Sequence, residues 1–194
     1  MKKFIIISLI TIILMIPIFF GVYTEFLLER NLELFGIPIV ILGLLLLLFI
    51  GWIINSFGFD VSNIESMRNH NVINALINGN YVILCFFFPI TMIMEELIFR
   101  YYLISFFSST LQLKTLSSIL ISSIAFSFYH IHTWFTFKNQ RILVINLSYT
   151  LMLGLFNGYM FIMLGIIPCI IIHYLLAFYF YYYLYTKNFK KKMI

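Results

Sequence analysis

Long uninterrupted runs of apolar residues restrict the fold of this chain more than any other feature of its sequence. A helix needs about 20 mostly apolar residues to cross the hydrocarbon core of a bilayer. Six segments approach this length: residues 4–23, 35–54, 81–107, 116–135, 142–164 and 166–185. Runs such as the five consecutive leucines at 44–48 do not alternate as the strands of a membrane barrel do. The sequence therefore predicts an all-α fold, a polytopic transmembrane bundle of about six spanning helices.

The composition excludes a soluble domain and a nucleic-acid-binding protein. Of the 194 residues, 63% are hydrophobic and 10% are charged, whereas soluble domains have about 25% charged residues. The formal net charge is +5, but the cations lie at the ends of apolar segments and not on one basic face. Both cysteines, Cys85 and Cys169, fall in apolar runs, which favours buried thiols over a disulfide. We expect the lipid bilayer, and no nucleic acid, as a partner.

The distribution of lysine and arginine predicts the orientation, because these residues accumulate on the cytoplasmic side of membrane proteins. With a cytoplasmic N-terminus, six spans place two cations outside, Arg30 and Lys114. The inside set is larger: Lys2, Lys3, Arg68, Lys138, Arg141, Lys187, Lys190, Lys191 and Lys192. We therefore predict a multi-pass protein of the cell membrane with both termini in the cytoplasm. The first apolar run is longer than a signal-peptide core and lacks a cleavage site, so it is predicted to be a retained helix.

Two further segments carry open alternatives. The polar stretch 55–80 is predicted to be a cytoplasmic loop, although its spaced apolar residues are also compatible with a short interfacial helix. Gly154 and Gly158 form a G-x-x-x-G pattern, which lets two helices approach closely. Packing within the chain is the favoured interpretation of this pattern, and dimerisation is the alternative.

Ionisable residues inside the apolar segments are rare and mark a candidate site, because a charge at the bilayer centre costs at least about 2.5–3.5 kcal/mol. They are Glu95, Glu96, Arg100, His130, His132 and His173. On a helix, Glu96 and Arg100 share a face and can form an ion pair, while Glu95 points about 100° away. This spacing indicates a structural role for Glu96 and a chemical one for Glu95. His130 and His132 would lie on nearly opposite faces of a helix, so only one is expected to enter the site.

These residues resemble the motifs of a known family. Residues 95–100 read E-E-x-x-x-R, residues 126–130 read F-x-x-x-H, and residues 154–177 resemble the segment that leads into H-x-x-x-N. The three motifs occur in this order in the CAAX-protease and bacteriocin-processing (CPBP, or Abi) family of intramembrane proteases. The resemblance covers residues 81–185. It divides the chain into two N-terminal helices with a loop (1–80), a protease-like core (81–185) and a basic cytoplasmic tail (186–194).

The resemblance implies a role for each residue of the site. Glu95 would be the general base that activates water, with assistance from His130. Glu96 and Arg100 would shape the site, and His173 would help to stabilise the oxyanion. The family pattern has Asn or Asp four residues after the last histidine, where this chain has Ala177, and Tyr101 stands where many members have Gly. Tyr174, Tyr179 and Asn157 are candidates for the missing donor.

A divalent metal, zinc above all, is an alternative to a metal-free mechanism, and its predicted ligands are Glu95, His130 and His173. The function expected from the resemblance is hydrolysis of a peptide bond in a short, lipidated or membrane-associated peptide. In bacteria the family is linked to peptide maturation and bacteriocin self-immunity. Because of Ala177, the competing hypothesis is a non-catalytic member that acts as a membrane-bound immunity or partner-binding protein.

Overall fold

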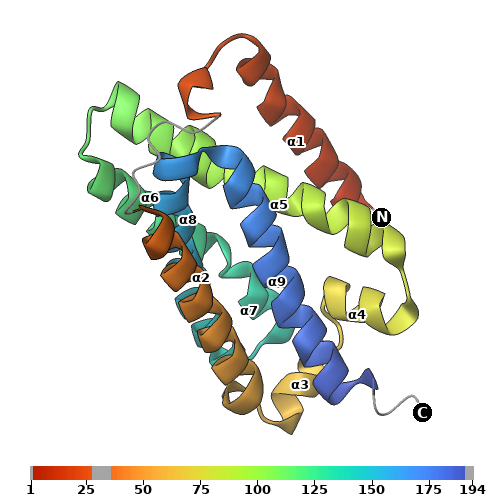
Figure 1. Ribbon diagram of the computed structural model, residues 1–194. Coiled ribbons are helices and arrows are strands. Elements are labelled where there is room, and N and C mark those ends of the chain that lie inside the picture. The colour runs from red at the N-terminus through yellow and green to blue at the C-terminus, as the bar shows by residue number, and fades with distance from the viewer. Residues whose placement is uncertain (1, 28–35, 191–194) are drawn as a thin grey trace.

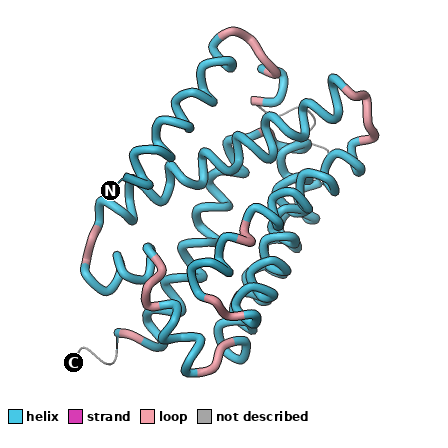
Figure 2. Tube along the Cα trace, turned by 180° about the vertical axis from the view of Figure 1, so that it is seen from behind, coloured by secondary structure: helices cyan, strands magenta, loops and turns pink. Residues whose placement is uncertain are grey.

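The protein is a bundle of helices joined by short connections, and no strand occurs among the residues that the structure describes (Figures 1 and 2). A computed structural model describes residues 2–27 and 36–190. The predicted all-α bundle is confirmed. The predicted start of the second span at residue 35 and the cations Arg30, Lys191 and Lys192 lie outside the described residues.

Four helices among the described residues are long and apolar enough to cross a membrane. They are α1 (Lys2–Phe19), α2 (Gly36–Ile53, continued by the π-helical turn η2, Ile54–Gly58), α8 (Gln140–Leu164) and α9 (Ile166–Asn188). Helices α1 and α2 expose most of their large apolar side chains, as helices that face lipid do. A single 3₁₀ turn, η1 (Thr24–Phe26), follows α1, and Gly165 separates α8 from α9 with a φ of 81° that favours glycine.

The other two predicted spans are helical but differ from simple membrane helices. The third comprises the π-helix η3 (Ile83–Phe87), the α-helix α5 (Phe88–Glu96), and the π-helices η4 (Leu97–Ile104) and η5 (Phe106–Thr110). This segment contains Glu95, Glu96 and Arg100, so its charge distinguishes it from the four apolar spans. The fourth is α6 (Thr115–Tyr129), which has only 15 residues; a turn then leads into the short α7 (His132–Phe137).

The polar stretch at 55–80 is folded into two short helices and is not an open loop. These are α3 (Val61–Met67) and α4 (Asn71–Asn78). Asp60 caps α3 by accepting a hydrogen bond from the backbone N–H of Asn63 at 2.8 Å, and this bond lowers the pKa of Asp60. His70 caps α4 in the same way through its ring. Side chains such as that of Asp60 favour the first position of a helix, where they accept a backbone N–H, and this explains why short helices form in a polar connecting segment. The location of this connection in the cytoplasm stays a prediction.

Close packing of α6 against α8 forms the centre of the bundle. A methyl group added at Gly154 would lie 3.0 Å from Cβ and 3.1 Å from Cα of Ser123, and one at Gly158 would lie 2.7 Å from a methyl of Ile119. The G-x-x-x-G residues therefore pack within the chain. Ser122 on α6 also donates to the backbone carbonyl of Phe99, which ties α6 to the segment that carries the glutamates.

Replacement of Gly154 by alanine is expected to lower the free energy of unfolding by about 1–3 kcal/mol, because the new methyl would press on backbone that cannot move aside. Thermal unfolding in detergent micelles would measure the change. Gly51→Ala is the matched control, since its added methyl would meet no atom closer than 3.4 Å. Equal stability of the two variants would contradict the close approach of α6 and α8.

Candidate active site

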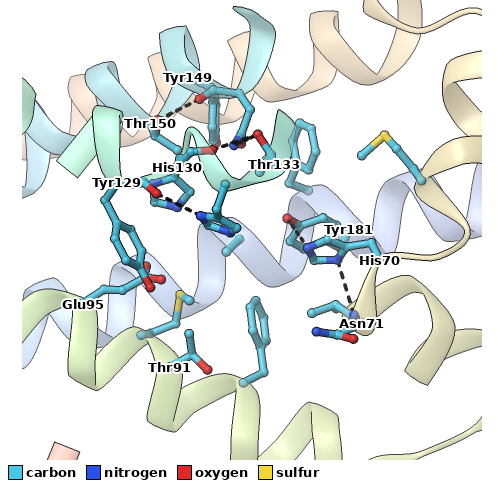
Figure 3. Close-up of a pocket in the computed structure, with 18 of the residues that line it drawn as sticks. His70, Asn71, Thr91, Glu95, Tyr129, His130, Thr133, Tyr149, Thr150 and Tyr181 are labelled. Atoms are coloured by element: carbon cyan, nitrogen blue, oxygen red, sulfur yellow. Dashed lines mark hydrogen bonds between the residues drawn. The ribbon is translucent and has the colours of Figure 1, made fainter. Parts of the chain in front are cut away.

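The two glutamates occupy the last turn of α5, and they have different surroundings. Glu96 is fully buried, whereas Glu95 is 4% exposed and faces a cavity. One oxygen of Glu95, Oε2, has no hydrogen-bond partner among the described residues. This oxygen is itself buried, but the residue lines a cavity that can hold water or substrate, and Figure 3 shows Glu95 at one side of that cavity.

An ion pair and two hydrogen bonds hold Glu96. Nε of Arg100 lies 3.3 Å from Oε2 of Glu96, and both side chains are completely buried. The other oxygen, Oε1, accepts hydrogen bonds from Nδ1 of His173 at 2.7 Å and from Nδ2 of Asn157 at 3.0 Å. The guanidinium also lies over the ring of Phe126, 4.1 Å from its centroid. These contacts match the structural role that the four-residue spacing indicated for Glu96.

His173 connects the two carboxylates. Because Nδ1 donates to Glu96, its other nitrogen, Nε2, is turned toward Glu95, at 3.8 Å from Oε2. The chain turns at Gly165, between α8 and α9, and this turn allows His173 on α9 to reach both glutamates. Asn157 on α8 donates to the backbone oxygen of Cys169 on α9, and the thiol of Cys169 donates to the backbone oxygen of Asn157, so the two helices are held in register on either side of Gly165.

His130 presents one free nitrogen to the same cavity. Its Nδ1 lies 2.9 Å from the backbone oxygen of Phe126 and donates to it, which leaves Nε2 as an acceptor. His132 also lines the cavity, and the two rings are 5.7 Å apart. The two residues do not lie on opposite faces of one helix, because α6 ends at Tyr129 and both rings line the cavity beyond that end.

The cavity has a volume of about 170 Å³ and extends from Glu95 to the first residues of α1 and α4. Figure 3 shows Glu95 on one side of it and His70, at the start of α4, on the other. A space of this size holds several water molecules. Residues from α1, α4, α5, α6, α7, α8 and α9 contribute to its wall. Glu95, His130 and His173, which the sequence suggested as a group, all line it. Ionisable residues within membrane-spanning segments generally face the interior of the bundle or a cavity, and these residues do so.

Metal binding has no geometric support among the described residues. They contain no group of three or more His, Cys, Asp or Glu side chains that could hold a metal ion. Glu95, His130 and His173 share the cavity without forming such a group.

Ala177, which stands where the family pattern has Asn or Asp, forms part of the cavity wall. Ala177 lies on α9 one turn after His173 and lines the cavity. None of the three proposed substitutes fills its place: Tyr174 donates to the backbone oxygen of Leu84 at 3.5 Å, Tyr179 does not line the cavity, and Asn157 is bound to Glu96. Residues that the sequence argument did not single out, His70 and Tyr181, line the cavity instead. The helical spacing of His173, Ala177 and Tyr181 is the signal that would have revealed the tyrosine.

Comparison with known proteins gives one family. Residues 77–189 match the family described as type II CAAX prenyl endopeptidase Rce1-like. The matched segment contains α5, α6, α8 and α9 in full, and therefore every residue of the candidate site. No curated protein and no solved structure matches the chain.

Proposed function

Because the chain belongs to the Rce1-like family of type II CAAX prenyl endopeptidases, a family of membrane proteases, we propose that it hydrolyses a peptide bond within the membrane by means of a glutamate-activated water. The substrate would be a short, lipidated or otherwise membrane-associated peptide. In this proposal the protein crosses the cell membrane several times with both termini in the cytoplasm, and its cavity opens on the cytoplasmic side. Processing of a secreted peptide or protection against a bacteriocin are the biological settings in which such hydrolysis would act.

The observation that supports the proposal is that the two glutamates differ in their hydrogen-bond and ion-pair partners. Glu96 has its charge balanced by Arg100, whose Nε faces Oε2, and its Oε1 accepts hydrogen bonds from both His173 and Asn157. Glu95 lines the cavity and accepts no hydrogen bond from any described residue, although Nε2 of His173 lies 3.8 Å from its Oε2. A pair of carboxylates that served only to link helices would both be satisfied, because a buried polar group without partners is costly. A carboxylate that accepts no hydrogen bond, lies near His173 and shares a cavity with His130 is suited to proton transfer.

The first chemical step would use Glu95 and His130. A water in the cavity donates one hydrogen to Glu95, while Nε2 of His130 orients it by accepting the other. Attack of the water on the carbonyl carbon breaks the carbonyl π bond, moves the proton to Glu95 and leaves a negative charge on the carbonyl oxygen.

The second step would return the proton. His173, when protonated on both nitrogens, donates from Nε2 to the oxyanion, and Glu96 balances the charge of its ring through Nδ1. A donor placed there contributes about 3–4 kcal/mol to the lowering of the barrier. Collapse of the intermediate breaks the C–N bond as Glu95 hands the proton to the departing amine, which restores the carboxylate.

A comparison of small membrane-associated peptides in the native host tests this function. Mass spectrometry of cells with the wild-type protein is set against cells with Glu95→Gln at equal membrane levels. A peptide shortened only by the wild type would support hydrolysis and identify the substrate. Identical peptides in both, together with a phenotype that survives the substitution, would overturn the proposal.

Restoration of the missing amide gives a second prediction. Ala177→Asn places a donor on the cavity wall one turn after His173, so turnover is expected to be kept or raised, by up to about 10²-fold. Ala177→Leu is the control of similar volume without a donor, and it should not raise turnover. Hydrolysis of a substrate peptide by the purified variants measures both. A strong loss with asparagine would mean that the cavity has no room for a donor at this position.

Ala177 also favours the competing function, a non-catalytic protein that binds a membrane partner or a bacteriocin. In that case the wall at Ala177 would be a contact surface and Glu95 would be dispensable. The two functions differ in one measurable respect: binding survives Glu95→Gln, and hydrolysis does not.

A further inference from the structure

Away from Glu95, the cavity has a second polar region, which the mechanism above does not use. Four side chains from different parts of the chain line it: Lys3 on α1, His70 at the start of α4, His132 on α7 and Tyr181 on α9. Figure 3 shows His70 and Tyr181 on the opposite side of the cavity from Glu95. We call this group of four residues the rim cluster.

The ring of His70 is held rigidly. It stacks on Tyr181 with the ring centroids 4.3 Å apart and the planes 16° from parallel. Nδ1 accepts the backbone N–H of Val72 at 3.4 Å, as the cap of α4, and Nε2 lies 3.1 Å from the hydroxyl oxygen of Tyr181. Burial, and to a smaller extent the charges of Lys3 and His132, lowers the pKa of His70 to about 3. The ring is therefore neutral at physiological pH.

The state of His70 determines which proton Tyr181 can offer. A neutral ring whose Nδ1 accepts a hydrogen bond carries its proton on Nε2. Nε2–H then donates to the hydroxyl oxygen of Tyr181, so the hydroxyl accepts a hydrogen bond from His70 and does not donate one to it. Tyr181 has no other hydrogen bond from its hydroxyl among the described residues. Its O–H is left as a donor at the cavity wall.

The charge of the cavity indicates the kind of ligand that this donor meets. Glu95 is the only carboxylate among the described residues that line the cavity, and it lies on the other side. Lys3 is exposed and forms no ion pair with any described residue. An ammonium and a phenol O–H attract an anionic oxygen, whereas a positively charged amino terminus would be repelled.

We propose that Tyr181 and Lys3 form a subsite for the carboxylate at the C-terminal end of the peptide substrate. His70 is a positioning residue, which acts by orienting the hydroxyl of Tyr181. This subsite rests on the proposed function for the identity of its ligand as a peptide. With the carboxylate at the rim cluster, the chain of the peptide would run toward Glu95, and the distance between the two regions would decide how many residues follow the cleaved bond.

Binding to a protein that cannot hydrolyse its ligand tests the subsite. The probe is a fluorescent, S-farnesylated peptide that ends in Cys-Val-Ile-Met, prepared both as the free acid and as the C-terminal amide. Fluorescence anisotropy with Glu95→Gln protein in maltoside micelles, which lack phosphate, gives both dissociation constants. The acid is expected to bind about 10-fold to 100-fold more tightly than the amide, the range for charge-assisted hydrogen bonds.

Variants then assign the preference to particular residues. In the Glu95→Gln background, Tyr181→Phe and Lys3→Gln should each weaken binding of the acid by about tenfold and leave the amide unchanged. His70→Phe should reproduce the effect of Tyr181→Phe, since it removes the bond that orients the hydroxyl. Tyr179→Phe, on the same helix but outside the cavity, is the matched control and should bind like the parent.

Several outcomes would overturn the subsite. They are equal binding of acid and amide, no binding of either, and a loss in Tyr181→Phe that affects both forms alike. Loss of the acid preference on addition of phosphatidylglycerol would assign the anion site to a lipid headgroup instead. Failure of the proposed function would look different: the wild-type protein would leave the acid peptide intact although the acid preference in binding persists.

Discussion

Glu95→Gln is expected to abolish peptide hydrolysis and to leave the protein folded in the membrane. The amide has the shape of the carboxylate but cannot accept a proton from water, and loss of a general base lowers rates by about 10²–10⁴-fold. The fold should tolerate the change, because Oε2 of Glu95 has no hydrogen-bond partner to lose. Cleavage of a substrate peptide in proteoliposomes, together with the elution profile in detergent, measures the two effects separately.

Glu65→Gln is the matched control for this experiment. Glu65 lies on α3, is largely exposed and, among the described residues, pairs with Arg68 alone, at 3.3 Å. An exposed pair of this kind contributes little to stability. Activity of Glu65→Gln should therefore equal that of the wild type. Cleavage by Glu95→Gln at the wild-type rate would exclude the glutamate-base mechanism.

Arg100→Met is expected to lower the free energy of unfolding strongly. Removal of the guanidinium leaves the Glu96 carboxylate buried without its cation, and breaking a buried pair from one side costs about 3–5 kcal/mol of unfolding free energy. Thermal unfolding in detergent should show this loss. Arg68→Met, at the exposed pair on α3, is the control and should unfold like the wild type.

A double variant separates the stability of this pair from its function. Glu96→Leu combined with Arg100→Met removes both charges, so much of the lost stability should return, as it does when buried ion pairs are replaced by apolar residues. Hydrolysis should not return, because His173 loses the acceptor that orients its ring. A double variant as unstable as Arg100→Met alone would show that the packing around the guanidinium, and not the charge, supports the bundle.

The parts of the site that the sequence predicted depend on short-range geometry. Glu96 and Arg100 are four residues apart, and this spacing was enough to predict their ion pair. His173 needed more than spacing. Its place was inferred from a family motif, and the contact with Glu96 joins residues 77 positions apart.

The parts that the sequence did not predict depend on where helices end and on contacts between distant segments. The fourth span was predicted to continue to residue 135, but α6 ends at Tyr129, and this end alone brings His132 into the cavity. His70 and Tyr181 are 111 residues apart, and the histidine lies in a stretch whose composition predicted a loop. A helix cap such as His70 can be recognised from neighbouring residues in the sequence. Its position at the cavity depends on how distant helices pack, which the local sequence does not show.

The hydrogen-bond partners of the two glutamates outside the third segment are encoded after it, and this order has a consequence for biosynthesis. Residues 81–107 leave the ribosome before Asn157 and His173 have been translated. Glu96 and Arg100 can pair within the segment, but Glu95 has no cation of its own there, and a charge in hydrocarbon is unfavourable by about 2.5–3.5 kcal/mol or more. It is therefore expected to remain beside the translocation channel until α8 and α9 arrive. Nascent chains would then have no assembled site, and the membrane would be spared hydrolysis by unfinished copies.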